Sequence, residues 1–290
     1  MSLSPKDPMR PIPVPKQARV TEGKVTLAGG TRLYYWDTGG KGEPIVLCHP
    51  ASGSAMIWGY QQPVFAKAGY RVISYSRRNF WKSDKVDPKN PGAASEDLRQ
   101  VVEFLGIDRF HAVASAAGGS VASDFATSYP ERLHTLTISS NPCGIRTGYI
   151  SNSWLTIRPE GWEDLPREFW EVGPSYRAVN PKGLKAWMTL EHKSGGHGHR
   201  QKQVNNLSEK HLEKRKIPTL LMTGEQDLAT PPVIQRMVAR HVPDCEVVIA
   251  SESGHSLYWE RPDLFNKAVL DFLKRRGPKA AKKKRVKKKR

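Results

Sequence analysis

HAVASAAGGS, residues 111–120, is the stretch of sequence that decides the fold of this chain. An apolar run at residues 110–113 enters a cluster of small residues, and a second apolar segment at residues 121–126 leaves it. This pattern predicts a strand, a tight turn and a helix in succession. Small residues are needed in such a turn because its central residue is strained and the neighbouring chain passes very close to it.

The predicted turn lacks one chemical group. Turns of this kind usually read G-x-S-x-G and present the serine hydroxyl as a nucleophile. When Gly118 and Gly119 are aligned with the end of that motif, Ala114 stands at its first glycine and Ala116 at the nucleophile. The sequence therefore keeps the turn without the hydroxyl, and any chemistry assigned to the chain has to account for that difference.

Length and composition are those of a globular chain that can bury a sizeable core. The chain has 290 residues, of which 38% are hydrophobic, and no run of about 18 apolar residues predicts a membrane span. The Pro-rich N-terminus has no apolar h-region, so residues 1–16 are expected to form an extended arm rather than a secretory signal. Cys48, Cys143 and Cys245 stand apart beside apolar runs, which favours buried free thiols and a cytoplasmic location.

The net charge of +18 is concentrated at the C-terminus. Residues 277–290, GPKAAKKKRVKKKR, hold nine lysines and arginines and no acid, which is half of that net charge. This composition after a Gly-Pro break predicts a disordered basic tail. Two interpretations stay open: a solvated tail, or a weak electrostatic contact with nucleic acid or an anionic surface. The tail contains no aromatic residue that would stack on bases.

Strand-like and helix-like segments alternate along most of the chain. A hairpin is expected from residues 24–28 and 31–36, and continuous apolar runs predict buried strands at residues 43–49, 70–76, 109–115, 133–140, 217–223 and 245–250. Helical patterns occur at residues 57–67, 94–105, 121–128, 233–240 and 262–274. The alternation predicts an α/β fold with a doubly wound, mostly parallel sheet.

The alternation stops between residues 145 and 216. This segment is rich in tryptophan and polar residues and contains a periodic helix at residues 182–192. An insertion between two core strands predicts a helical lid over residues 145–216, beside a core made of residues 17–144 and 217–276. A lid forms one wall of the cleft that it covers, so some of its aromatic side chains are expected to face a ligand.

Several motifs, in the right order, resemble those of the α/β-hydrolase superfamily over about residues 25–273. LCHPASGSAMIW, residues 47–58, is similar to the family's His-Gly oxyanion loop, with Pro50 in place of the usual glycine. YSRRNFWKSD, residues 75–84, is similar to its D-x-R-G-x-G-x-S segment and keeps Arg78 and Ser83. GEQDLATPP, residues 224–232, matches the loop of the catalytic acid, and SGHSLYWE, residues 253–260, begins the segment of the catalytic histidine. The resemblance implies an α/β-hydrolase fold with a lid and a site of the Ser-His-Asp type.

The resemblance also implies which groups do the chemistry. Asp227 and His255 would form an acid–base pair, in which the carboxylate fixes the imidazole tautomer and stabilises the imidazolium. The oxyanion hole would use the backbone N–H groups of Ala51 and Ala117. Backbone donors survive the replacement of side chains, so the site is still expected to bind a carbonyl or carboxylate oxygen.

Ala116 has two explanations that the sequence leaves open. In the first, alanine replaces a serine by engineering, and the native protein is an esterase, lactonase or similar hydrolase that forms an acyl-enzyme. In the second, alanine is native, as in a branch of the superfamily whose elbow reads Gly-Thr-Ala-Ala-Gly-Gly, and His255 activates water or abstracts a substrate proton. Ala114 mildly favours the second, because a single engineered change does not account for both alanines.

Candidate substrate-binding residues are the polar or aromatic side chains expected around the cleft: Ser52, Trp58, Phe80, Trp81, Trp154 and Trp187. Cationic residues near the cleft, such as Arg78 and Arg146, are compatible with an acidic substrate. His197 and His199 lie in a Gly-rich stretch without an evident third ligand, so no metal is expected. No Gly-rich phosphate loop follows the first buried strand, and no cofactor is expected.

Together these features predict a cofactor-free α/β hydrolase that acts on a small carbonyl-containing substrate: an ester, a lactone or a C–C bond. Two alternatives stay open. One is lyase, decarboxylase or direct-water chemistry by His255 without an acyl-enzyme. The other is a catalytically inactive homologue that binds a ligand. The presence of Asp227 and His255 favours an enzyme, because a protein that only binds needs no acid–base pair.

Overall fold

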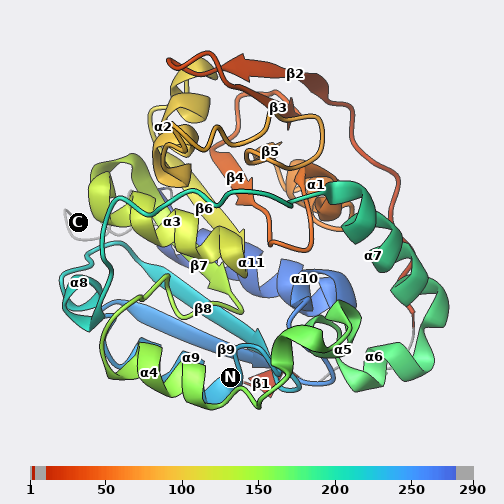
Figure 1. Cartoon of the computed structure of the whole chain (residues 1–290). Coiled ribbons are helices and arrows are strands. Elements are labelled where there is room, and N and C mark those ends of the chain that lie inside the picture. The colour runs from red at the N-terminus through yellow and green to blue at the C-terminus, as the bar shows by residue number, and fades with distance from the viewer. Residues whose placement is uncertain (1, 4–10, 279–290) are drawn as a thin grey trace, which may run out of the picture.

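One mixed sheet with helices on both faces makes up the core of the computed structural model, which describes residues 2–3 and 11–278 (Figure 1). Within these residues the strand order is β1-β9-β8-β7-β6-β4-β5-β3-β2. The strands are β1 (Ser2–Leu3), β2 (Thr21–Thr26), β3 (Arg32–Asp37), β4 (Pro44–Cys48), β5 (Arg71–Tyr75), β6 (Phe110–Ser115), β7 (Leu133–Ser139), β8 (Thr219–Gly224) and β9 (Cys245–Ala250). Only the β2–β3 and β3–β5 pairings are antiparallel. The predicted doubly wound, mostly parallel sheet is therefore confirmed.

Helices cover both faces of this sheet. The long core helices are α2 (Ala94–Phe104), α3 (Ala117–Ser128), α9 (Pro232–Ala239) and α11 (Pro262–Arg276), with the shorter η1 (Ala55–Trp58), α1 (Gln62–Lys67), η2 (Pro130–Arg132) and α10 (Leu257–Glu260). In Figure 1, α2 and α3 lie in front of the sheet and α11 lies behind it. Successive side chains of a strand point to opposite faces of the sheet, so each buried strand contributes apolar side chains to the core on both faces.

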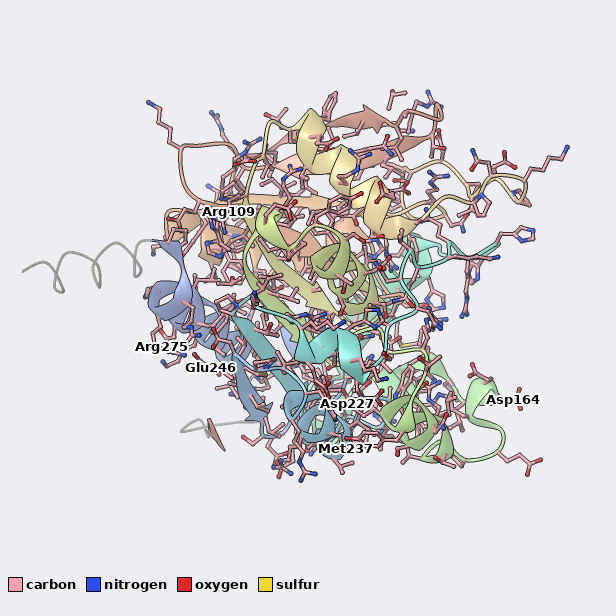
Figure 2. The ribbon with its side chains drawn as sticks, turned by 90° about the vertical axis from the view of Figure 1, so that its left-hand side faces the viewer. Arg109, Asp164, Asp227, Met237, Glu246 and Arg275 are labelled. Carbon is pink, nitrogen blue, oxygen red and sulfur yellow. The ribbon has the colours of Figure 1, made fainter. Side chains whose placement is uncertain are left out.

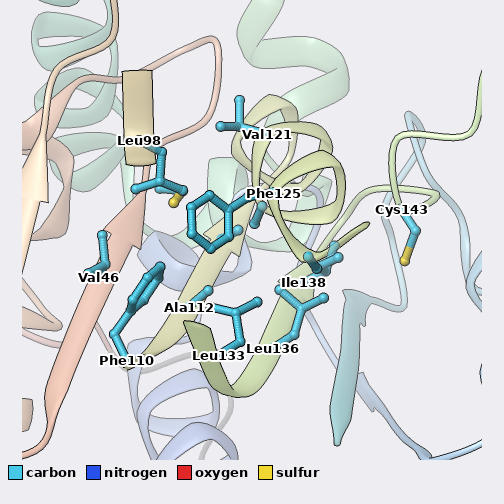
Figure 3. Close-up of a cluster of buried hydrophobic side chains, with 14 of the residues drawn as sticks. Val46, Leu98, Phe110, Ala112, Val121, Phe125, Leu133, Leu136, Ile138 and Cys143 are labelled. Carbon is cyan, nitrogen blue, oxygen red and sulfur yellow. The ribbon is translucent and has the colours of Figure 1, made fainter. Parts of the chain in front are cut away.

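The alternation is visible in β4 and β6. Val46 and Ala112 point into the cluster that packs against α2 and α3, which includes Leu98, Phe110 and Phe125 (Figure 3). Their neighbours along the same strands, such as Ile45, Leu47 and Val113, point into the second cluster on the opposite face. Two-sided burial explains why the parallel strands read as continuous apolar runs in the sequence.

The small residues of the deciding stretch bring α3 against β4. A Cβ atom on Gly118 would lie 2.1 Å from the carbonyl oxygen of Cys48, and one on Gly119 would lie 2.8 Å from Ile138 Cγ2. Real Cβ atoms do not approach backbone so closely, so any side chain at Gly118 would push the helix away. The helix also begins earlier than the expected residue 121. Paired glycines have low helix propensity, and here tertiary packing overrides it.

Further differences from the predicted elements have local causes. The expected helix at residues 57–67 is interrupted, because η1 ends before Gly59 and α1 begins anew with Pro63 in its first turn. Ser2 and Leu3 pair with β9, so the predicted arm over residues 1–16 includes a short strand. Residues 4–10 and most of the predicted basic tail, residues 279–290, lie outside the described residues.

Helices occupy the segment between β7 and β8, residues 145–216, which we call the insertion. They are α4 (Tyr149–Thr156), η3 (Trp162–Asp164), α5 (Arg167–Glu171), α6 (Pro174–Val179), α7 (Pro181–Ser194) and α8 (Glu209–Glu213). The connection from α7 to α8 crosses the front of α3 (Figure 1). It is fastened there because the Asp124 carboxylate accepts hydrogen bonds from the backbone N–H groups of Val204 and Asn205, both at 2.9 Å.

Candidate active site

A histidine and an aspartate meet at the carboxyl edge of the sheet. His255 Nδ1 lies 2.9 Å and 3.0 Å from the two carboxylate oxygens of Asp227, and both side chains are buried. Asp227 follows β8 and His255 follows β9, so two adjacent parallel strands deliver them to one place. Figure 2 shows Asp227 far from Arg109, which precedes β6 at the opposite end of the parallel strands.

Asp227 is held in one orientation by its own loop. Its carboxylate accepts hydrogen bonds from the backbone N–H groups of Ala229 and Thr230 at 2.9 Å and 2.8 Å, and from Thr223 Oγ1 at 2.8 Å. These donors compensate the buried charge and aim it at the imidazole. His255 Nε2 takes part in no hydrogen bond with the described residues. That nitrogen is therefore the free proton acceptor of the pair.

Two further carboxyl groups, those of Glu171 and Glu260, lie close enough to His255 to stabilise its protonated form. Glu171, at the end of α5, accepts a hydrogen bond from Ser52 Oγ, while its backbone oxygen accepts one from the Ser256 N–H at 2.8 Å. Glu260 accepts the N–H groups of Gly173 and Gly254 at 2.8 Å and 2.9 Å. The insertion thus touches both the loop of His255 and the loop that precedes η1.

The charges around His255 decide its proton affinity. Burial lowers the pKa of His255, but the carboxylate of Asp227, helped by Glu171 and Glu260, outweighs burial and raises that pKa above its ordinary value. Burial raises the pKa of Glu171 despite the opposing effects of His255 and Ser52. Burial likewise raises the pKa of Glu260 to about 7, against the lowering effect of its backbone donors.

Ala116 occupies the strained position of the turn between β6 and α3. Its backbone angles are φ 46° and ψ −121°, in a region that residues with a side chain rarely adopt. Such a conformation costs on the order of 1–3 kcal/mol. The strain places Ala117 at the first position of α3, where the N–H has no partner within the helix. Neither this N–H nor that of Ala51 is used in a hydrogen bond with the described residues.

A half-buried arginine braces the loop that carries Ala51. Arg77 donates from Nη2 to the carbonyl oxygens of His49 and Pro50, both at 3.1 Å. Its backbone N–H donates to His49 Nε2 at 3.0 Å, while His49 Nδ1 lies 2.7 Å from the Pro50 oxygen. Burial, and then the charge of Arg77, hold the pKa of His49 well below its ordinary value, so His49 is neutral. Pro50, which replaces a glycine of the family pattern, is thus fixed by its carbonyl oxygen.

Comparison with known proteins gives the family. The model of the alpha/beta hydrolase family matches residues 45–268. This chain belongs to the α/β-hydrolase family. Among its relatives, a 2-hydroxy-6-oxononadienedioate/2-hydroxy-6-oxononatrienedioate hydrolase of Burkholderia vietnamiensis is 27% identical, with 84% of this chain and 91% of the relative covered. A 2-hydroxy-6-oxo-6-phenylhexa-2,4-dienoate hydrolase of Comamonas testosteroni is 26% identical, with 84% and 92% covered.

Solved structures agree on the fold. A thermophilic esterase from Thermogutta terrifontis superimposes with a TM-score of 0.72 at 22% identity, covering 90% of this chain and 100% of that chain. The enol-lactonase from Burkholderia xenovorans LB400 superimposes with a TM-score of 0.70 at 21% identity, covering 87% and 100%. The predicted superfamily, the α/β-hydrolase fold and the expectation of a hydrolase are therefore confirmed.

The predicted oxyanion donors and substrate contacts lie in different parts of the structure, some at a cavity and others in the interior. A cavity of about 270 Å³ is lined by Ala51, Ala117 and Phe80, together with residues of the connection from α7 to α8. Phe80 packs edge-on against His49, at 4.6 Å between ring centroids. Ser52 is fully buried, and its hydroxyl proton is engaged by Glu171 instead of being free for a substrate.

The predicted tryptophans do not line this cavity. Trp58 is 0% exposed and packs against the tilted rings of Tyr258 and Phe265, which corrects its predicted role as a substrate contact: it is a core residue. Trp187 is 1% exposed and belongs to the same hydrophobic cluster under α7. Trp81 packs beside that cluster. Trp154 donates from Nε1 to the Ala229 oxygen at 2.6 Å, so it supports the loop of Asp227.

Other side chains near the site were not among the predicted residues. Trp170 of α5 packs edge-on toward the His255 ring, at 6.3 Å between centroids, and Glu171 follows it directly. Glu171 and Arg77 carry no sequence signal that separates them from surface charges. Burial distinguishes Glu171, whereas the half-buried Arg77 is distinguished by its contacts with His49 and Pro50. Both properties depend on the tertiary structure.

Residues 2–3 and 11–278 contain no group of three or more His, Cys, Asp or Glu side chains placed to hold a metal ion. In the same part of the chain, no helix is long and apolar enough to cross a membrane.

Replacing Glu171 with glutamine is expected to lower the pKa of His255. Glutamine keeps an oxygen for the Ser52 hydroxyl but removes a negative charge that stabilises the imidazolium, while Asp227 and Glu260 stay in place. The measurement is an NMR titration of the histidine side chains, with His255→Ala assigning the resonance. Glu168→Gln, which makes the same charge change on α5, should leave the midpoint unchanged. An unchanged midpoint in E171Q would show that Glu171 is uncharged when His255 titrates.

Proposed function

We propose that this α/β hydrolase cleaves a small carbonyl compound by direct attack of water, with His255 as the base and the N–H groups of Ala51 and Ala117 as oxyanion donors. The observation that carries the proposal is the His255–Asp227 pair with its free Nε2, at the same carboxyl edge of the sheet as a strained turn that holds no hydroxyl. In this reaction the strained backbone of Ala116 would place the Ala117 N–H at the start of α3, where it can donate to the oxyanion.

The proposed reaction needs no acyl-enzyme, because water supplies the nucleophile and His255 holds its proton until the leaving atom takes it. Water adds to the carbonyl carbon as its proton moves to His255 Nε2, and Asp227 stabilises the imidazolium through Nδ1. The negative charge that forms on the carbonyl oxygen is held by the Ala51 and Ala117 N–H groups, which contribute on the order of 3–4 kcal/mol in comparable sites. The bond to the leaving group then breaks, and Nε2 returns the proton to the leaving atom. The products are a carboxylic acid and an alcohol, an enol or a carbon acid.

Three bond types are candidates: an ester, a lactone and a C–C bond next to a ketone. The names of the relatives support this range, because two of them are hydrolases of 6-oxo dienoates or dioates and two structural neighbours are an esterase and an enol-lactonase. The buried free thiols of Cys48 and Cys143 support the predicted cytoplasmic location.

A substrate panel tests the proposal. The unmodified chain is incubated with an aryl ester, an enol-lactone and a 1,5-diketone with an enolisable leaving group, and products are identified by mass. The expected result is turnover of at least one class, faster above the raised pKa of His255 than below it, because the base must be neutral to accept a proton. Absence of turnover for every class, with intact binding of the same compounds, would contradict the proposal.

A further inference from the structure

The cavity beside the oxyanion donors carries an excess of positive charge. It is lined by six cationic side chains: Arg77, Arg78, Arg146, Arg167, Arg200 and Lys202. Asp124 is the one carboxylate among its lining residues in the described part of the chain. A concave wall of one charge sign concentrates ligands of the opposite sign.

Some of these charges are already compensated. Arg78 forms a two-pronged pair with Asp97, with both N–O distances at 2.8 Å, and Arg167 lies 3.2 Å from Glu191. The Asp124 carboxylate is occupied by the Ser95 hydroxyl at 2.6 Å and by the backbone of the α7–α8 connection. These groups therefore serve the structure of the cavity.

Arg77 is a different case, because its partners are neutral. Its guanidinium donates to the carbonyl oxygens of His49 and Pro50 and lies over the Phe80 ring, 4.8 Å from the centroid. It has no ion pair with a described residue, and its Nη1 makes no hydrogen bond there. A half-buried, fixed cation without an anionic partner is costly to the fold, and an anionic ligand removes that cost.

The mouth of the cavity adds cations that are equally unpaired. Arg200 and Lys202 are exposed on the α7–α8 connection and have no ion pair with described residues. Arg146 is exposed as well, and its Nε donates to the neutral Gln203 side chain at 2.5 Å. These three charges line the cavity where it meets solvent, whereas Arg77 lies beside the loop of Ala51.

We propose that this cavity binds a carboxylate of the substrate, with Arg77 as the binding residue next to the oxyanion loop and Arg146, Arg200 and Lys202 attracting the anion at the entrance. The substrate class is a small carboxylic acid that carries a second, cleavable carbonyl group. Arg77 Nη1, which makes no hydrogen bond with a described residue, can donate a charge-assisted hydrogen bond to a carboxylate oxygen. The assignment rests on the proposed function for one point, that the cleavable carbonyl group lies at Ala51 and Ala117.

Calorimetric binding of adipate, a six-carbon dicarboxylate, tests the proposal without turnover. Adipate is expected to bind the full chain more weakly as salt rises, and uncharged dimethyl adipate is expected not to bind. Arg77→Gln should weaken adipate binding about tenfold or more. The double variant Arg146→Gln/Arg200→Gln should weaken it as well and reduce its salt dependence, since both side chains are exposed and neither forms an ion pair with a described residue.

Arg236→Gln is the matched control, because Arg236 is exposed on α9 and does not line the cavity. Its adipate affinity should equal that of the parent. Equal affinity in all variants, equal binding of dimethyl adipate, or binding of inorganic phosphate in place of adipate would each overturn the proposal. Adipate binding requires no catalysis, so the two proposals can fail separately. Adipate binding by a parent chain without turnover would contradict only the proposed function. Turnover by a parent chain that does not bind adipate would contradict only the carboxylate site.

Discussion

Replacing Ala116 with serine is expected to give this hydrolase a reactive nucleophile and to raise aryl-ester turnover by about 10³-fold or more. The backbone at position 116 already has the strained geometry of a nucleophile turn, and the His255–Asp227 pair is assembled. A hydroxyl introduced there would pass its proton to His255 and attack the ester carbonyl. The measurement is aryl-ester hydrolysis together with covalent labelling by a fluorophosphonate, read by intact mass.

Ala116→Gly is the matched control for this prediction. It adds no hydroxyl and relieves the positive φ, so it should remain unlabelled and be slightly more stable than the parent. The combination of Ala116→Ser with His255→Ala should lose both labelling and turnover. If Ala116→Ser were neither labelled nor active while remaining folded, then His255 Nε2 would not face position 116, and the proposed geometry of attack would be wrong.

Replacing His255 with alanine is expected to lower turnover of the chain's own substrate by about 10²–10⁴-fold. His255 supplies the proton acceptor for water, and its Nε2 has no competing partner among the described residues. Substrate affinity should change little, because the oxyanion donors and the cationic cavity stay intact. Single-turnover rates and equilibrium binding, measured on the same variant, separate these two effects.

Two companion variants make this result specific. Asp227→Asn should also reduce turnover, since the amide no longer stabilises the imidazolium or selects its tautomer. His241→Ala should have no effect, because His241 pairs with Glu213 and Tyr149 away from the cavity. Equal activity of His255→Ala and the parent would remove the base from the mechanism. Retained ligand binding by a parent without turnover would instead identify a protein that only binds.

Local sequence patterns were sufficient to predict the strands of the sheet. The continuous apolar runs of β4 to β8 follow from burial on both faces, whereas β9 is only partly buried. Every predicted core strand appears with its ends displaced by a few residues at most. The Gly118–Gly119 pair predicted a close approach, and the Cys48 carbonyl oxygen is what approaches. The motifs around Asp227 and His255 were equally local, since each lies in a loop directly after a strand, and strand order brings the two loops together.

Burial of charged and aromatic side chains could not be inferred in this way. Trp58 and Trp187 were expected at the cleft, but a tryptophan in a helix has the same local pattern whether its neighbours are substrate or core. In the sequence, Glu171 is one of several acids between residues 160 and 171, and Arg77 is one of two adjacent arginines. Only the docking of the insertion on the strand ends buries Glu171 beside His255 and leaves Arg77 without a carboxylate.

The sequence alone was sufficient to predict the family, the mostly parallel sheet and the pairing of His255 with Asp227, because these depend on residue types at fixed local spacing. The tertiary structure decided three further features: the carboxylates that raise the pKa of His255, the arginine that braces the Ala51 loop, and the cationic cavity beside that loop. Electrostatic effects depend on distance and burial between segments far apart in the chain, and neither quantity is encoded in local spacing.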